Sequence, residues 1–144
     1  MGRVIFLCTG NSCRSQMAEG WLRHLGGEQL EAFSAGTHPA GKNPLALCAM
    51  GEVGVDITGQ ESENLDKYAE QPFDYVITVC DRAREVCPVF PGGDRQLHWS
   101  FDDPAEAQGT DEERMPEFRR VRDEIRERIE RFLGEMMASS DWRK

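Results

Sequence analysis

A cysteine, an arginine and a serine stand close together near the amino terminus, in the stretch CTGNSCRS at positions 8–15. Five residues separate the cysteine from the arginine, so one short loop holds the Cys8 sulfur and the Arg14 guanidinium. A guanidinium is a planar fork of N–H donors that matches two oxygens of a tetrahedral anion, and it stays charged at neutral pH. The spacing therefore indicates an oxyanion site with Cys8 as nucleophile and Arg14 as substrate clamp.

The residues around this stretch place it between a strand and a helix. Residues 3–7 (RVIFL) form a short apolar run typical of a buried strand, and apolar residues recur at helical spacing from Met17 to Leu25. Unpaired N–H groups at the start of a helix and the helix dipole both favour a bound anion. We expect Gly10 to let the backbone curl around that anion. The predicted substrate-binding set is Thr9, Gly10, Asn11, Ser12, Cys13 and Arg14.

The same surroundings act on the thiols of the loop. A helix amino terminus and a guanidinium lower the pKa of a nearby thiol from about 8.5, so we expect Cys8 to be a thiolate at neutral pH. The Ser15 hydroxyl can donate a hydrogen bond to that sulfur, which would make Ser15 a catalytic residue as well. Cys13 falls on the outer side of such a loop, and we expect it to be a small packing residue.

The composition is typical of one globular domain. The chain has 144 residues, of which 39% are hydrophobic and 30% charged, with a formal net charge of −9. We assign residues 1–137 to a single catalytic domain and residues 138–144 to a frayed tail. The acidic balance disfavours a nucleic-acid partner, and the apolar run at residues 4–8 is too short for a membrane span or an export signal. We therefore expect a cytoplasmic monomer without a disulfide framework, although it has five cysteines.

Alternating strand-like and helix-like segments predict an α/β fold. After the first strand and helix we predict strands at 30–35, 73–80 and 96–101, a helix that begins at Pro44 and a shorter helix at 62–71. Cys48 falls on the apolar side of the helix after Pro44. A last helix carries an apolar stripe over 118–136, with ion pairs such as Glu124–Arg128 outside it. The elements make a three-layer sandwich with a four-stranded parallel sheet in the order 2-1-3-4 and helices on both faces.

The carboxyl ends of parallel strands share one edge of the sheet, where ligands bind in open α/β folds. Cys80 ends the predicted strand 73–80, so it should approach Cys8 at this edge. Residues 96–101 bring Asp103 to the same edge, where it can act as general acid toward an oxygen leaving the bound anion. A simple capping or turn role for Asp102 and Asp103 is the alternative. His38 also follows a strand, and we interpret it as a surface histidine.

Cys80 and Cys87 are separated by a polar segment of six residues. If this segment is helical, the two lie about 10 Å apart along the helix axis, whereas a disulfide needs Cα atoms within about 7 Å. A bond between them therefore requires the segment to unwind. Two alternatives remain for these thiols, a zinc site completed by His98 and inert core cysteines.

Residues 8–15 resemble the phosphate-binding loop of low-molecular-weight protein tyrosine phosphatases. Taken with Cys80, Cys87 and Asp103, they resemble the thioredoxin-coupled arsenate reductases built on the same fold. The resemblance spans nearly the whole chain, since it also includes residues 16–21 (QMAEGW), 34–36 (SAG), 98–99 (HW) and 118–125 (FRRVRDEI). It implies an oxidoreductase that converts arsenate to arsenite in arsenic detoxification, with phosphate and sulfate as competing oxyanions.

The resemblance also implies a relay of three thiols. Cys8 attacks arsenic, Cys80 attacks the Cys8 sulfur to release arsenite and form a transient Cys8–Cys80 disulfide, and Cys87 then attacks Cys80. Thioredoxin reduces the resulting Cys80–Cys87 disulfide, and no tightly bound cofactor is implied. Some family members bind a potassium ion beside the loop. The matching positions here are Asn11, Glu19, Ser34 and Glu63, with Glu63 where an aspartate is usual.

Two other functions remain open. A phosphatase acting on phosphate monoesters through the Cys8–Arg14 loop needs Asp103 but not the later thiols. Phosphatases of this fold carry an aromatic residue after the Asp-Pro pair, where this chain has Ala105. A non-catalytic thiol- or metal-binding module is the remaining possibility. Arsenite release that depends on thioredoxin distinguishes the three.

Overall fold

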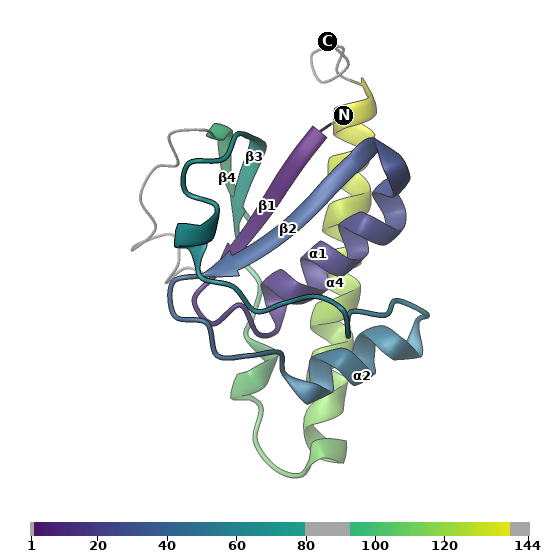
Figure 1. Ribbon diagram of the computed structural model, residues 1–144. Coiled ribbons are helices and arrows are strands. Elements are labelled where there is room, and N and C mark those ends of the chain that lie inside the picture. The colour runs from purple at the N-terminus through teal and green to yellow at the C-terminus, as the bar shows by residue number, and fades with distance from the viewer. Residues whose placement is uncertain (1, 80–92, 139–144) are drawn as a thin grey trace.

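The computed structural model describes residues 2–79 and 93–138, and a parallel sheet of four strands forms its centre (Figure 1). The strands are β1 (Gly2–Cys8), β2 (Leu30–Gly36), β3 (Phe73–Thr78) and β4 (Gly93–His98). Their order is β2-β1-β3-β4 and all neighbours are parallel, which confirms the predicted topology. The register pairs Cys8 with Gly36, so the ends of β1 and β2 lie side by side.

Three helices lie on one side of the sheet, namely α1 (Arg14–Gly26), α2 (Pro44–Glu52) and α4 (Asp111–Ala138) (Figure 1). Val4 and Phe6 of β1 pack with these helices in the larger apolar cluster, whereas Ile5 and Leu7 point to the other face. In the described residues that other face is covered by a segment that includes the 3₁₀ helix η2 (Leu65–Lys67). None of the described helices has the length and apolar character that crossing a membrane requires.

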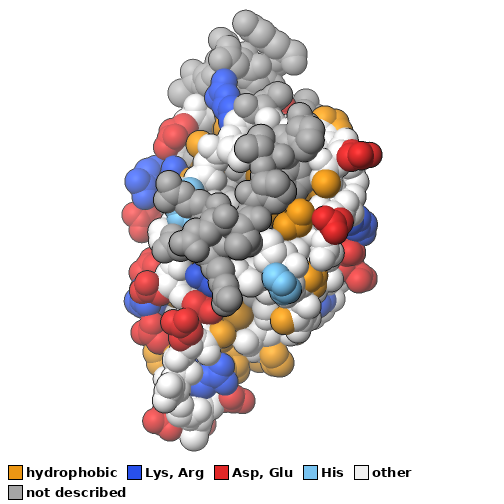
Figure 2. All heavy atoms as spheres, turned by 90° about the vertical axis from the view of Figure 1, so that its left-hand side faces the viewer, with side chains coloured by type: hydrophobic (Ala, Val, Ile, Leu, Met, Phe, Trp, Pro, Cys, Tyr) orange, Lys and Arg blue, Asp and Glu red, His pale blue; other side chains and the backbone are white. Residues whose placement is uncertain are grey.

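The helix α4 buries one apolar stripe, as its periodicity predicts. The fully or almost fully buried members are Phe118, Val121, Ile125, Ile129, Phe132 and Met136. The predicted Glu124–Arg128 pair is wrong, since Glu124 pairs with Arg120 at 2.8 Å and Arg128 approaches Glu135 at 3.7 Å. Arg128 stacks over the Trp99 ring at 4.5 Å, which directs its guanidinium toward the end of the sheet. Figure 2 shows acidic and basic side chains interspersed on one face of the described residues.

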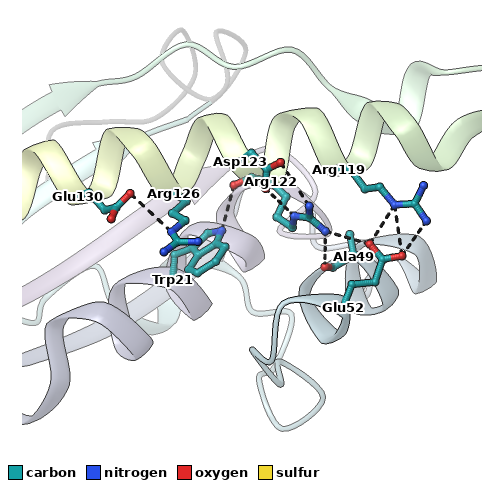
Figure 3. Close-up of polar contacts among 8 residues, drawn as sticks. All are labelled: Trp21, Ala49, Glu52, Arg119, Arg122, Asp123, Arg126 and Glu130. Carbon is teal, nitrogen blue, oxygen red and sulfur yellow. Dashed lines mark hydrogen bonds and ion pairs between the residues drawn. The ribbon is translucent and has the colours of Figure 1, made fainter.

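A buried arginine fastens α2 to α4 (Figure 3). Arg122 is 8% exposed, and its Nη1 donates to the Ala49 carbonyl at 2.9 Å and to Glu52 Oε1 at 3.0 Å. A cation at the carboxyl end of a helix complements the helix dipole. Hydrogen bonds from Arg119, and then from Arg122, lower the pKa of the Glu52 carboxyl. Trp21 of α1 donates to the Arg122 carbonyl at 3.0 Å, so the three helices meet at this point.

The predicted helix at 62–71 is wrong, because only η2 within it is helical. The main chain of Glu63 is used elsewhere: its carbonyl accepts from Gly36 N at 2.8 Å, and its N–H donates to Asn11 Oδ1 at 2.7 Å. Asn64 then starts the short turn by accepting from Asp66 N at 2.8 Å. Contacts to the end of β2 and to the loop after β1 therefore replace helical hydrogen bonds.

Other boundaries also differ from the prediction. β3 ends at residue 78, and β4 lies at 93–98 instead of 96–101, because the chain leaves the sheet after His98. Two further 3₁₀ turns are η1 (Gly27–Gln29) and η3 (Pro104–Glu106). Cys48 is exposed, so its predicted apolar position is wrong: α2 buries Ala46, Ala49 and Met50, and position 48 falls on the other side. Residues 139–144 of the predicted tail lie outside the described residues.

Candidate active site

Main-chain contacts from a single segment shape the loop between β1 and α1. The carbonyls of Thr9, Gly10 and Ser12 accept from the N–H groups of His38, Ala40 and Asn43 at 2.8, 2.8 and 3.1 Å. An oxyanion site requires loop N–H groups that turn toward the anion, and engagement of the loop carbonyls by residues 38–43 favours that orientation. The helix α1 begins at Arg14, so its amino terminus lies at the same place.

Gly36, and not Gly10, is the glycine on which this loop depends. A Cβ at Gly36 would lie 2.6 Å from the Thr9 carbonyl oxygen and 2.9 Å from Asn11 N. A Cβ at Gly10 would make only ordinary contacts, at 3.7 Å from its nearest neighbours. The end of β2 therefore approaches the loop so closely that a side chain does not fit. The sequence places Gly36 directly after a predicted strand, but it does not show this approach of the loop.

Asn11 takes the left-handed conformation in this loop, with φ of 45° and no exposed surface. Its side chain accepts from Glu63 N at 2.7 Å and donates to Ser15 Oγ at 2.9 Å. Because the Ser15 oxygen accepts this bond, the hydroxyl hydrogen is available to a second acceptor. This arrangement is consistent with the predicted hydrogen bond from Ser15 to the Cys8 sulfur.

The loop forms one wall of a cavity of about 530 Å³. The other wall is the strap, which we define as residues 100–106. The lining residues are Cys8, Thr9, Gly10, Ser12, Cys13, Arg14, Ser100, Phe101, Asp102, Asp103, Ala105 and Glu106. Arg14 joins the two walls, since its Nη1 donates to the Phe101 carbonyl at 3.0 Å and its Nη2 lies 3.5 Å from Asp103 Oδ2. Its Nε is buried and has no hydrogen-bond partner among the described residues, so one donor of the fork is uncommitted there.

The two neighbouring aspartates of the strap point in different directions. Asp103 faces Arg14 and also accepts from Ala105 N at 3.0 Å, which starts η3. Asp102 pairs instead with Arg120 of α4 at 3.1 Å, and its side chain is 78% exposed. The alternative capping role therefore applies to Asp103, and the same carboxylate lies beside Arg14, where the predicted acid would have to stand. Only the Asp103 carboxylate of this pair lies against the guanidinium that would hold the oxyanion.

Cys13 lies in the same loop as Cys8 but in different surroundings. It is 5% exposed and packs in the large apolar cluster, in agreement with the predicted packing role. Burial, with a further contribution from the Asp103 charge, raises the pKa of Cys13 to about 12. Cys13 is therefore a neutral thiol at neutral pH, and thiolate chemistry does not start from it.

The four positions that match a potassium site already have protein partners. Glu19 accepts from Ser34 Oγ at 2.6 Å and pairs with Arg23, while Glu63 pairs with Lys67 at 2.9 Å. Burial raises the pKa of the Glu19 carboxyl. Both carboxylates are thus neutralised by side-chain cations, and these residues do not fit a bound potassium ion. Across residues 2–79 and 93–138 no cluster of three or more His, Cys, Asp or Glu side chains could hold a metal ion.

The structure brings together Cys8, Arg14, Ser15 and Asp103. The other predicted loop residues lie at the same place, since Thr9, Gly10, Ser12 and Cys13 line the cavity and Asn11 contacts Ser15. Cys80 and Cys87 lie outside the described residues, and with them the zinc alternative. His98 contacts Thr78 Oγ1 at 2.7 Å. His38 is exposed and contacts the neighbouring Thr37, as expected for a surface histidine.

A cysteine and an arginine that a strand–loop–helix junction holds opposite an aspartate are typical of cysteine-dependent enzymes that act on tetrahedral oxyanions. Comparison with known proteins agrees with this class. The chain belongs to the family described as low molecular weight phosphotyrosine protein phosphatase, which matches residues 3–141.

Within this family the chain is similar to arsenate reductases. It is 52% identical over 129 residues to an arsenate reductase of Halalkalibacterium halodurans and 50% identical to that of Bacillus subtilis, with 90% of this chain and 93% of each relative covered. A solved arsenate reductase in the phosphate binding state matches with a TM-score of 0.81 and 32% identity, over 94% of this chain and 98% of that one. A thioredoxin-dependent arsenate reductase of Corynebacterium glutamicum matches at 0.73 and 29% identity, over 97% of this chain and 64% of that one.

Proposed function

We propose that this chain is an arsenate reductase that releases arsenite and is regenerated by thioredoxin. The observation that carries the proposal is the cavity in which Arg14 joins the Cys8 loop to Asp103. The relatives named arsenate reductase, one of them described as thioredoxin-dependent, support the substrate and the reductant. Arsenate and phosphate are tetrahedral oxyanions of similar shape, so one loop accommodates both.

In the first step the Cys8 thiolate attacks arsenic. An S–As bond forms and an As–O bond breaks, and the departing hydroxyl takes a proton from Asp103 to leave as water. Arg14 and the loop N–H groups hold the remaining arsenate oxygens and stabilise their charge. The hydrogen bond from Asn11 to Ser15 orients the Ser15 hydroxyl, which steadies the Cys8 sulfur. Asp103 must be protonated for this step and is close enough to Arg14 to meet the same anion.

The second step moves two electrons from the thiols to arsenic, and the third exchanges one disulfide for another. Cys80 attacks the Cys8 sulfur, the electron pair of the S–As bond departs with arsenic, and arsenite leaves with a Cys8–Cys80 disulfide behind. Cys87 then attacks the Cys80 sulfur, and Cys8 departs because the loop stabilises its thiolate. Thioredoxin reduces the Cys80–Cys87 disulfide and resets the enzyme. The relay rests on the sequence positions of Cys80 and Cys87 and on the resemblance to thioredoxin-coupled arsenate reductases.

The proposal also covers the competing anions, the cellular location, the oligomeric state and the biological role. Phosphate and sulfate compete with arsenate for the loop, and a relative solved in the phosphate binding state supports this. We further propose that the enzyme acts in the cytoplasm as a monomer and in resistance to arsenical compounds. Competition by phosphate is measured as a rise in the KM for arsenate with an unchanged kcat.

Arsenite release, measured with and without thioredoxin and its reductase, tests the function. Repeated turnover is expected only when the complete reducing system is present. Without it, release should stop after one equivalent, because each cycle leaves one disulfide in the enzyme. Arsenite production that does not depend on a reductant, or none under any condition, would refute the proposal.

A Cys87→Ser variant tests the order of the thiols. After one equivalent of arsenate, proteolysis and mass spectrometry should find a trapped Cys8–Cys80 disulfide in this variant and Cys80–Cys87 in the unchanged protein. Cys48 serves as an internal control because it is exposed yet has no place in the relay. Cys8 joined to Cys13 or Cys48 would overturn the assigned order.

A phosphatase activity on small phosphate monoesters is the second candidate, and membership of the phosphatase family favours it. The same loop and Asp103 would serve it. Ala105 is exposed at the edge of the cavity, so an aromatic ring of a substrate meets no aromatic partner at that position. Hydrolysis of p-nitrophenyl phosphate, compared between the unchanged protein and Ala105→Tyr, measures this activity. We expect weak hydrolysis that the added ring increases.

A further inference from the structure

Two buried glutamines contact each other behind the Cys8 loop. Gln16 directly follows Ser15 in α1 and has no exposed surface, and Gln60, between α2 and η2, is 6% exposed. Gln60 Nε2 donates to Gln16 Oε1 at 2.8 Å and to the Gln16 carbonyl at 3.0 Å. Burying a carboxamide costs free energy unless its donors and acceptors are paired. Two apolar side chains would fill this space at lower cost, which suggests that the hydrogen bonds of the pair have a role.

The Gln16 side chain reaches from this contact to the loop. Its Nε2 donates to the Asn11 carbonyl at 3.1 Å and to the Glu61 carbonyl at 2.9 Å. The Asn11 carbonyl also accepts from Ser62 Oγ at 3.0 Å. Asn11 holds the left-handed conformation, which asparagine adopts more readily than most residues but which still costs free energy relative to the right-handed one. Gln16 and the segment 60–63 supply contacts that offset this cost.

The far end of the pair is anchored to charged groups. Gln60 Oε1 accepts from Arg23 Nη1 at 3.1 Å, and Arg23 in turn pairs with the buried Glu19. A continuous series of contacts therefore runs from Arg23 through Gln60 and Gln16 to Asn11. It continues from Asn11 to Ser15, the residue predicted to support the Cys8 sulfur.

We propose that Gln16 and Gln60 are positioning residues, which hold Asn11 in its left-handed conformation and so keep the loop in the form that binds oxyanions. Without the pair, the Asn11 peptide is free to turn, and the hydrogen bond from Asn11 to Ser15 weakens. The loop then binds the anion less tightly and supports the Cys8 thiolate less. The proposal rests on the proposed function only in taking residues 8–15 as the oxyanion loop.

A Gln60→Met variant is the main test, because it keeps the length of the side chain, removes its hydrogen bonds and leaves the loop sequence intact. The rate of Cys8 alkylation by iodoacetamide is followed against pH, with and without inorganic phosphate, and the Cys8 peptide is quantified by mass spectrometry. We expect a higher pH for the midpoint of alkylation. Phosphate should protect Cys8 about fivefold less well, as loss of one hydrogen bond predicts.

Gln71→Met is the matched control. Gln71 is half-buried, accepts from Arg3 Nη2 at 2.7 Å and donates to the Lys67 carbonyl at 3.2 Å, so the same chemical change removes comparable contacts elsewhere. Its alkylation midpoint and phosphate protection should equal those of the unchanged protein. If both glutamine variants shift these values equally, or if folded Gln60→Met shifts neither, the proposal is wrong.

A double variant checks that the two glutamines act as one unit. Gln16→Met and Gln60→Met together should weaken phosphate protection no more than the worse single change, because both remove the same contact. Additive effects would show that each glutamine acts separately and would overturn the pair. These measurements use phosphate and alkylation alone, so they stand even if arsenate is not reduced.

Discussion

The two walls of the cavity are held in different ways. The loop of residues 8–15 is fixed by neutral hydrogen bonds among buried groups, with Asn11 and Ser15 fully enclosed. The strap of residues 100–106 is fixed by charged contacts nearer to solvent, where Asp102 meets Arg120 and Asp103 meets Arg14.

This difference follows from the cost of burial. Neutral groups can be buried if they are hydrogen-bonded, whereas buried charges lose far more solvation. Exposed ion pairs such as Asp102–Arg120 contribute about 0–1 kcal/mol each and re-form readily, and the partly buried Arg14–Asp103 pair is long, at 3.5 Å. We infer that the nucleophile is kept in one geometry, while the strap can shift when an oxyanion takes donors of Arg14 away from Asp103.

The largest effect is expected for the nucleophile of the 8–15 loop. Cys8→Ser should abolish arsenite release, because a serine hydroxyl is not ionised at neutral pH and cannot form the disulfide. Phosphate binding, measured by calorimetry, should persist since Arg14 and the loop remain. Arsenite release from this variant above the background without enzyme would show that another thiol starts the reaction.

The second largest effect is expected in the strap, at Asp103. Asp103→Asn should slow formation of the S–As adduct by about 10²–10⁴-fold, the usual contribution of a general acid. The loss of the free Cys8 thiol in a single turnover measures this step. Asp102→Asn is the matched control and should have little effect, because its carboxylate pairs with Arg120 on the exposed side. Equal slowing by both changes would mean that the wrong carboxylate was chosen.

The shape of the 8–15 loop can be tested by adding one carbon atom. Gly36→Ala places a Cβ 2.6 Å from the Thr9 carbonyl oxygen, so the loop must shift. A displacement of about 1 Å at a catalytic group costs about 10²-fold in rate, so we expect a fall of about that size in kcat/KM for arsenate. Gly134→Ala in α4, where a Cβ meets nothing within 4 Å, is the control. Normal activity in Gly36→Ala would show that the loop tolerates displacement.

The smallest effect on turnover is expected for Cys13→Ala, which should leave arsenite release nearly unchanged. Its effect on stability depends on pH. The fold raises the pKa of Cys13 from 9.0 to about 12, so the folded state keeps a proton that the unfolded chain loses. The stabilisation that comes from this retained proton is fully present below pH 9 and is lost as the pH rises toward 12. Denaturant unfolding should therefore show a smaller alkaline loss of stability in Cys13→Ala than in the unchanged protein.

Periodicity and spacing predicted the four strands of the sheet and the position of the Cys8 loop at its edge. The apolar run before Cys8, the helical spacing after it and the strand before Gly36 are local patterns, and the rule for parallel sheets brings them together. Asp103 was expected at this edge because it stands two residues after the predicted strand 96–101, and it lies there although the strand itself ends at His98. The sequence alone did not show that Asp102 and Asp103 point in different directions, because this depends on Arg120 in α4, which pairs with Asp102.

Contacts distant in sequence explain what the sequence did not predict. The segment 62–71 has a helical pattern, yet Asn11 and Gly36 take the main-chain groups of Glu63. The need for glycine at position 36 arises from the approach of the Thr9 carbonyl, which no local pattern reports. The potassium positions are a different case, because Arg23 and Lys67, which pair with Glu19 and Glu63, stand only four residues away in the sequence.

The dependence of the loop on residues 36, 38–43 and 60–63 has a consequence for folding. An isolated 8–15 segment lacks the partners that shape it, so only the native chain offers the oxyanion site. A ligand that binds only the native state stabilises it by RT ln(1 + [L]/Kd), about 2.7 kcal/mol at a hundredfold excess over Kd. Inorganic phosphate should therefore raise the melting temperature in proportion to the logarithm of its concentration. The protein should likewise resist proteolysis best when phosphate or arsenate is abundant.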